Sequence, residues 1–473
     1  YHLLLFLSQS GLHNVNLGNN NKPNYRFVSL KNNIIENVSD EQLSSLFREF
    51  IDQLEIDEKD KGFIIGELFD IIPYLTDPRK LKFGLEIKEI KFLKDSKDKS
   101  FFFFNNTVLE VSKNGINLVD YSDINGVVWR SNIIDKDFEP LLDDDIDNSL
   151  FSKFITNTCK DKDSFILDVD RHLSQRITIG YLLHRYKTPR NNKSIVYSEN
   201  NLESVANGRT GKSLIMKGIS HCRNTLKLDG RRLKLGNEFI FQHLDYDTEI
   251  IYIDDIDRFM KFETFYPTIS EGVRFRRIYE AEQWIPFHDS PKFALSTNYG
   301  LQGNSESDKA RRFDMELLSY YNATRTPALE FDSYFFDEWD DYEWNLFYNY
   351  MLQCVKLYFE NDCQLKEYKS DTLELKKLVS AIGKNFYEFA ETLQRDEFIP
   401  NSEIYSLYVS FLGVDDADIP KKGIAYKIKT YCETLGLEFE SKQQRVDNKN
   451  CRGYIIYSKI QDIQSSSLLG GVA

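Results

Sequence analysis

The chain has 473 residues, a formal net charge of −14 and a pI near 5.2. Its length is sufficient for two to four domains with complete cores. The acid excess argues against a protein that coats nucleic acid over its whole surface, so any contact with DNA has to be local. Six cysteines without zinc-ligand spacing indicate free thiols in a reducing compartment, and no 18-residue apolar run or signal peptide points to a membrane.

The first 145 residues predict a packed α+β unit. Residues 40–52 have helical periodicity, and 101–111 form a β-like block in which Asn105 and Asn106 can make a turn. The unit shows no acid pair with a nearby histidine, which a primase or polymerase site would require, so its role stays open. Residues 146–190 are expected to be a helical collar that ends near Pro189.

Residues 206–213 read ANGRTGKS, a phosphate-binding loop between a β-rich stretch at 193–198 and an apolar run at 214–216. In such a loop backbone N–H groups turn toward the phosphates, the lysine reaches the β- and γ-phosphates, and the serine hydroxyl binds Mg²⁺. Two departures leave chance occurrence as the alternative: Ala206 replaces glycine, and 199–205 separate the strand from the loop. The predicted ATP site comprises Asn207, Gly208, Arg209, Thr210, Gly211, Lys212 and Ser213.

An acidic pair follows the next strand. Residues 249–253 are a short apolar run of the kind that a buried parallel strand shows, and Asp254 and Asp255 come directly after it. Carboxylates at the carboxyl end of such a strand lie where α/β sheets bind ligands. We expect Asp254 to help hold Mg²⁺ and Asp255 to polarise the attacking water, with a solvated turn as the alternative.

A third strand, 292–297, ends in Asn298, a neutral amide that can hold the nucleophilic water without adding negative charge. Arg311 and Arg312 follow within 307–314. Arginine is suited to reach the developing phosphoryl charge from a neighbouring subunit. The alternative is a pair of surface salt bridges to Asp308 and Asp314, which would contribute little.

The loop, the acid pair, Ser-Thr-Asn and KARRFD occur in that order, and together they resemble the ATPase module of superfamily 3 helicases in phage and plasmid primase-helicase proteins. The match is specific over about 190–330. The resemblance implies an AAA+ α/β core, ATP and Mg²⁺ as cofactors, a ring hexamer, and an arginine supplied by the next subunit. It also implies translocation on single-stranded or forked DNA in the cytoplasm, which for a virus is the host's. A primase or polymerase could then be a partner or an upstream domain, since the chain starts at Tyr1 rather than Met.

The same resemblance implies a DNA-gripping hairpin at 270–279. Val273, Phe275 and Ile278 alternate with the basic residues Arg274, Arg276 and Arg277, as on a ribbon with one basic face, and Tyr279 could stack on a base. The alternative is an amphipathic strand whose basic face is only solvated.

The C-terminal part predicts a winged helix. Helices at 401–411, capped by Asn401, and at 423–432 precede two strands at 436–440 and 453–457 around a basic turn. Between 420 and 454 there are eight basic and four acidic residues, which favours nucleic-acid contact over a structural cap. The expected fold is thus an AAA+ P-loop core with an N-terminal α+β domain and a C-terminal winged helix. Its segments are 1–145, a collar 146–190, the core 191–331, a helical lid 332–390, the winged helix 391–463 and a flexible tail 464–473.

Two other functions remain open on these residues. An AAA+ ATPase that loads or remodels replication partners without unwinding would keep the nucleotide motifs but would not need the basic hairpin. A DNA-binding replication factor with a degenerate loop would not turn over ATP.

Overall fold

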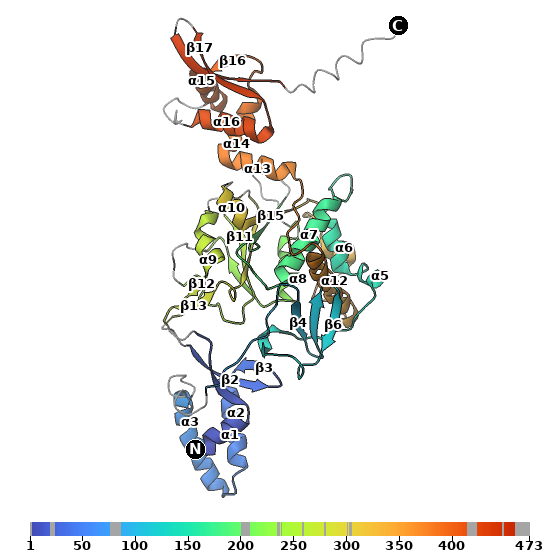
Figure 1. Cartoon of the computed structure of the whole chain (residues 1–473), viewed down its shortest axis with the longest axis vertical. Helices are drawn as coiled ribbons and strands as arrows, with labels where there is room; N and C mark the ends of the chain where they lie inside the picture. The colour runs from blue at the N-terminus through green and yellow to red at the C-terminus, as the bar shows by residue number, and fades with distance from the viewer. Residues whose placement is uncertain are drawn as a thin grey trace.

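The computed structural model describes residues 2–18, 24–75, 87–199, 209–233, 237, 239–257, 260–278, 281–299, 301, 305–413, 423–446 and 449–458. The described part is elongated, with a central α/β core between an N-terminal unit and a C-terminal unit at opposite ends (Figure 1). The expected tail at 464–473 lies outside the described residues.

A parallel sheet forms the centre of the core. Its strands lie in the order β10-β11-β14-β9-β15, and every neighbouring pair is parallel. All six residues of β9 and of β14 are buried, so neither strand has the alternating exposure of a strand with one face in solvent. The three predicted strands are confirmed, each beginning within one residue of the expected position. The strands are β9 (Ser194–Glu199), β10 (Thr225–Asp229), β11 (Ile250–Ile256), β14 (Lys292–Thr297) and β15 (Arg312–Leu317).

Helices and a hairpin cover the two faces of this sheet. Ile195 and Tyr197 of β9 belong to one apolar cluster with the helices α6, α7, α8 and α12, whereas Val196 belongs to a second cluster with the β12–β13 hairpin. This alternation is the two-residue period of a strand buried on both sides. The covering elements are α5 (Asp143–Ile146), α6 (Leu150–Asn157), α7 (Val169–Leu183), α8 (Lys212–Ser220), α9 (Tyr266–Glu271), β12 (Gly272–Phe275), β13 (Gln283–Pro286), α10 (Glu306–Arg311), α11 (Pro327–Phe331) and α12 (Asp341–Glu360).

Helix α12, which the sequence suggested as part of a lid, lies inside the core. It packs along α7, and the two helices approach so closely that a Cβ on Gly180 would lie 2.1 Å from the carbonyl oxygen of Cys354. The same apolar cluster contains Phe102 of the N-terminal segment and Phe347 of α12. One continuous core therefore crosses the expected boundaries at 145, 190 and 331.

The first 145 residues contain two small sheets: the sheet β1-β2-β3-β7 lies in the N-terminal unit, whereas the sheet β6-β5-β4-β8 lies beside α12 and contributes Phe102 and Leu109 to the core cluster (Figure 1). Helix α2 begins at Asp40 as predicted, because Ser39 and Gln42 form a reciprocal capping box. The predicted β-hairpin with Asn105 and Asn106 in its turn is also present. The elements are α1 (His2–Gln9), β1 (Leu12–Asn16), β2 (Tyr25–Lys31), β3 (Ile34–Asn37), α2 (Asp40–Asp52), α3 (Glu58–Leu75), β4 (Ser100–Phe104), β5 (Val108–Ser112), β6 (Gly115–Val119), β7 (Val128–Trp129) and β8 (Ile133–Ile134).

The C-terminal unit has its own apolar cluster and a sheet in the order β16-β18-β17. Both predicted helices are present, but Pro400 rather than Asn401 is the N-cap of α15, without a side-chain bond, and the strands of the hairpin are longer than predicted. No helix within the described ranges is long and apolar enough to span a bilayer. The elements are α13 (Asp371–Ile382), α14 (Lys384–Glu391), β16 (Phe398–Pro400), α15 (Asn401–Leu412), α16 (Ile424–Leu435), β17 (Phe439–Val446) and β18 (Lys449–Ile456).

Candidate functional site

The predicted site residues meet at the carboxyl edge of the central sheet. Strand β9 lies between β14 and β15, the two strands of the sheet that come last in the chain, so the chain leaves β9 at a topological switch point. The ends of β9, β11 and β14 bring Glu199, Asp254 and Asn298 to the same edge as the start of α8. This is the edge at which open α/β sheets bind ligands.

The second half of the predicted phosphate loop has the backbone that the motif requires. Gly211 is the N-cap of α8 with φ 103°, and a Cβ there would lie 2.8 Å from the ring of Phe154, so glycine is needed on both counts. The helix then begins at Lys212, which leaves its first N–H groups facing the crevice. Ala206, Asn207 and Gly208 lie outside the described residues.

The side chain of Lys212 is nearly buried, and its ammonium group donates three hydrogen bonds. Its Nζ donates to Glu199 Oε1 at 2.5 Å, to Asn298 Oδ1 at 2.8 Å and to Thr210 Oγ1 at 3.3 Å. Burial lowers the pKa of Lys212, and the carboxylate of Glu199 opposes that shift. Sequence reasoning missed Glu199; the available signal was an acid as the last residue of the strand that precedes the phosphate-loop motif.

Asp254 is held by a cluster of donors. Its Oδ1 accepts from Tyr252 OH and Ser296 Oγ, both at 2.6 Å, and from Ser213 Oγ at 3.5 Å. Lys227 Nζ lies 2.7 Å from its Oδ2. Burial by itself would raise the pKa of Asp254, but these bonds outweigh it and lower the pKa.

Asp255 has an unusual backbone for a residue other than glycine, with φ 58°. Asn298 Nδ2 donates to its Oδ1 at 3.3 Å, and Arg231 Nε lies 2.6 Å from its Oδ2. Because Asn298 also accepts from Lys212, it joins the phosphate loop to the acid pair. The motifs did not point to Lys227 or Arg231, because Lys227 is brought beside the acids by the pairing of β10 with β11, and Arg231 follows β10 in the chain.

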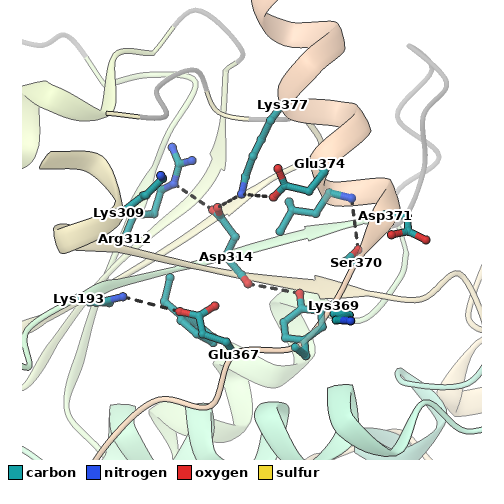
Figure 2. Close-up of a pocket in the computed structure, with 13 residues that line it drawn as sticks. Lys193, Lys309, Arg312, Asp314, Glu367, Lys369, Ser370, Asp371, Glu374 and Lys377 are labelled. Carbon is teal, nitrogen blue, oxygen red and sulfur yellow. Dashed lines mark hydrogen bonds and ion pairs between the residues drawn. The ribbon is translucent and has the colours of Figure 1, made fainter. Parts of the chain in front are cut away.

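The two arginines of KARRFD have different environments. Arg312, the first residue of β15, is 7% exposed, and its Nε lies 3.1 Å from Asp314 Oδ1. It faces a pocket of about 510 Å³ between β15 and α13, where Lys377 also approaches Asp314 (Figure 2). The alternative drawn from the sequence was a surface salt bridge; the structure shows Arg312 paired with Asp314, but the two side chains are only 5% and 15% exposed.

Arg311 ends α10 and is partly exposed. Its Nε donates to Ser270 Oγ at 2.9 Å, and its guanidinium lies 4.7 Å from the ring centre of Tyr266. Arg312 is paired with Ser194, the first residue of β9, so both arginines lie at the amino edge of the sheet. The length of β9 separates that edge from Glu199 by roughly 17 Å. Neither arginine can reach the phosphate loop of its own chain.

A hairpin forms between β12 and β13, with Arg274 opposite Trp284, but only its first strand lies within the predicted range 270–279, because β13 begins at Gln283. Val273 and Phe275 are buried and Arg274 is exposed, as the alternation requires. After β12 the predicted pattern is wrong. Ile278 is 62% exposed, whereas Arg277 turns inward and donates to the carbonyl of Leu244 at 2.7 Å. Tyr279 lies outside the described residues.

No protein-family model matches the chain, and no curated protein matches it either. Among solved structures, the A-form apo structure of the NrS-1 C-terminal region is similar at 10% identity and a TM-score of 0.43, with 96% of this chain and 99% of that chain covered. JCV helicase bound to a small thiazolopyridine compound is similar at 11% identity and a TM-score of 0.26, over 51% and 70% of the two chains. A full-length MCM homolog from Methanopyrus kandleri is similar at 11% identity and a TM-score of 0.24, over 70% and 69%. At these scores the function has to be argued from the site.

Proposed function

We propose that this chain is a P-loop ATPase of the superfamily 3 helicase type, which forms a ring and uses ATP to move along single-stranded DNA. One observation carries the ATPase: Lys212, Asp254, Asp255 and Asn298, which are far apart in sequence, are joined by hydrogen bonds through Asn298 and Ser296 at one sheet edge. Chance occurrence of the loop motif would not bring an acid pair and an amide to its lysine.

The residues divide the work of hydrolysis between them. Lys212 and the first N–H groups of α8 bind the phosphates. Ser213 and Asp254 supply the two oxygen donors that fit Mg²⁺, a cation that takes one or two carboxylates besides substrate phosphates. When bound, the cation neutralises phosphate charge. Asp255 and Asn298 orient the attacking water, with Asp255 accepting its proton.

Arg311 completes the site of a neighbouring subunit. It is partly exposed at the amino edge of the sheet, whereas Arg312 is paired with Asp314 inside its own chain. In a ring, head-to-tail packing places unlike edges of neighbouring subunits together, so an arginine at one edge can serve a phosphate loop at the other.

The β12–β13 hairpin and the C-terminal unit provide the contacts to DNA. The side chain of Arg274 is 70% exposed and lies 3.3 Å from Glu282, a surface pair that a DNA phosphate can replace. The order α14, β16, α15, α16, β17, β18 is that of a winged helix, and Arg445, Lys449 and Arg452 are exposed on its hairpin.

The central test compares three lysine and aspartate variants. Lys212→Ala should abolish ATP binding, whereas Asp255→Asn should bind ATP and lose hydrolysis, because it removes water activation and keeps the phosphate contacts. Lys217→Ala is the matched control, since Lys217 lies on the same helix but pairs with Asp337 at the surface. Equal hydrolysis rates for Asp255→Asn and wild type would refute the assignment.

A second candidate is an ATPase that remodels protein partners without unwinding DNA. The pairing of Arg274 with Glu282 and of Arg277 with Asp245 favours it, because both cations already have acidic partners. ATP hydrolysis that single-stranded DNA does not stimulate, together with unchanged activity in Arg274→Gln, would select this candidate.

A further inference from the structure

A short segment, residues 244–247, joins the N-terminal unit to the hairpin of the core. Leu244 is fully buried in the cluster beneath the hairpin, and Tyr246 packs against both that cluster and the cluster of the N-terminal sheet. Figure 1 shows the β1–β2 end of that sheet extending toward β12 and β13, away from α1 to α3. We call residues 244–247 the joint.

The carboxylate of Asp245 in the joint is shared by two arginines from different units. Arg26 of β2 binds both oxygens, with Nη1 3.2 Å from Oδ2 and Nη2 3.1 Å from Oδ1. Arg277, just after β12, places Nη2 3.0 Å from the same Oδ2. The two cations therefore share one anion, and Arg26 has the bidentate geometry that makes such pairs strong.

The neighbouring residues add specific hydrogen bonds and ring contacts between the N-terminal unit and the hairpin. Asn24 Nδ2 donates to Gln283 Oε1 of β13 at 3.1 Å and to Tyr246 OH at 3.2 Å. The ring of Tyr246 meets Phe275 of β12 edge-on at 6.2 Å. The N-terminal sheet thus contacts both strands of the hairpin, either directly or through Tyr246.

We propose that the N-terminal unit controls the grip of the hairpin on single-stranded DNA, with Asp245 retaining Arg277 and Arg26 taking over the carboxylate when Arg277 moves to a phosphate. The proposal rests on the DNA contact proposed above and assigns a role to the first 145 residues. Releasing Arg277 would be costly if it left Asp245 without a partner, because a half-buried carboxylate is stabilised by its cation. With Arg26 in place, the carboxylate keeps its bidentate partner.

This arrangement predicts opposite effects for two substitutions in the same joint. Asp245→Asn removes the anion that retains Arg277, so affinity for a labelled oligo-dT should rise several-fold, and log K against log salt should steepen by about 0.7 for one added phosphate contact. Arg26→Gln leaves Arg277 as the main cation on Asp245, so affinity should fall several-fold. The measurement is fluorescence anisotropy of the full chain over a salt series.

Matched controls separate the joint from general charge effects. Asp247→Asn makes the same charge change in the same segment, where Asp247 accepts from Ser131 Oγ at 2.5 Å, and Lys31→Gln makes the same change as Arg26→Gln on the exposed end of β2. Both control variants should bind oligo-dT with nearly the wild-type affinity, apart from the small effect of changing the net charge by one unit. Tighter binding by Arg26→Gln, or unchanged binding by both joint variants, overturns the proposal.

A third variant keeps the test valid if Asp245→Asn folds poorly. In an Arg277→Gln background, Arg26→Gln should have no further effect on affinity for oligo-dT, because Asp245 no longer has Arg277 to retain. An undiminished effect contradicts the mechanism. Failure of the proposed function looks different, since wild type would then not bind oligo-dT at all. If wild type binds oligo-dT, and Arg274→Gln weakens that binding while Arg26→Gln leaves it unchanged, the proposed DNA contact is supported and the proposed role of the joint is refuted.

Discussion

Replacing Glu199 by glutamine tests how the proposed nucleotide site is held without ATP. The side chains of Glu199 and Lys212 are only 3% and 10% exposed, and their charged atoms lie 2.5 Å apart. Removing one partner of such a buried pair typically costs about 3–5 kcal/mol, because the other charge stays buried. Glutamine keeps an acceptor oxygen for Lys212, so we expect a loss near the lower end, about 3 kcal/mol.

ATP should recover part of that loss. In wild type, a phosphate has to take Lys212 from Glu199, whereas in Glu199→Gln the ammonium meets the phosphate without a competing carboxylate. If ATP recovers half of the loss, about 1.4 kcal/mol, its affinity rises about tenfold. The thermal midpoint should therefore be lower than that of wild type without ATP and rise more when ATP is added.

The experiment combines thermal unfolding with calorimetric titration of ATP in the presence of Mg²⁺. Glu249→Gln is the control, because Glu249 forms an equally buried pair with Arg223, at 3.3 Å, outside the set of residues that meet at the phosphate loop. The control should lose stability and leave the ATP affinity unchanged. ATP affinity in Glu199→Gln that equals or falls below the wild-type value would show that Glu199 does not compete with phosphate.

Three further predictions follow from other contacts. Arg311→Ala mixed with Lys212→Ala should regain part of the ATPase activity, because some mixed interfaces pair an intact loop with an intact arginine; no recovery in confirmed mixed rings contradicts a shared site. Gly180→Ala should lower the thermal midpoint by several degrees, since its Cβ would lie 2.1 Å from the carbonyl oxygen of Cys354. Burial lowers the pKa of His221 from 6.5 to about 4, so the unfolded chain binds more protons between these values and stability should fall as pH decreases from 6.5 to 4. His221→Phe should show a shallower fall in midpoints measured over that range, and an equal slope would rule out this contribution.

Local patterns in the sequence were sufficient for the elements that carry the site. The predicted strands at 193–198 and 292–297 are present and are buried on two faces, and α2 begins at Asp40 because its capping box is encoded within four residues. The phosphate-loop motif then gave the acid pair after the second predicted strand and the amide after the third their predicted roles. These signals need only neighbours in sequence, so no knowledge of the packing was required.

The partners of these residues depend on strands that meet only in the folded chain. The pairing of β10 with β11 brings Lys227 beside Asp254, and the placement of β15 at the sheet edge buries Arg312 and leaves Arg311 accessible. A tertiary contact likewise turns Arg277 toward the joint, against its alternating pattern. Periodicity shows that a residue is on a strand or a helix, but the free energy of non-local packing decides which surface that residue faces.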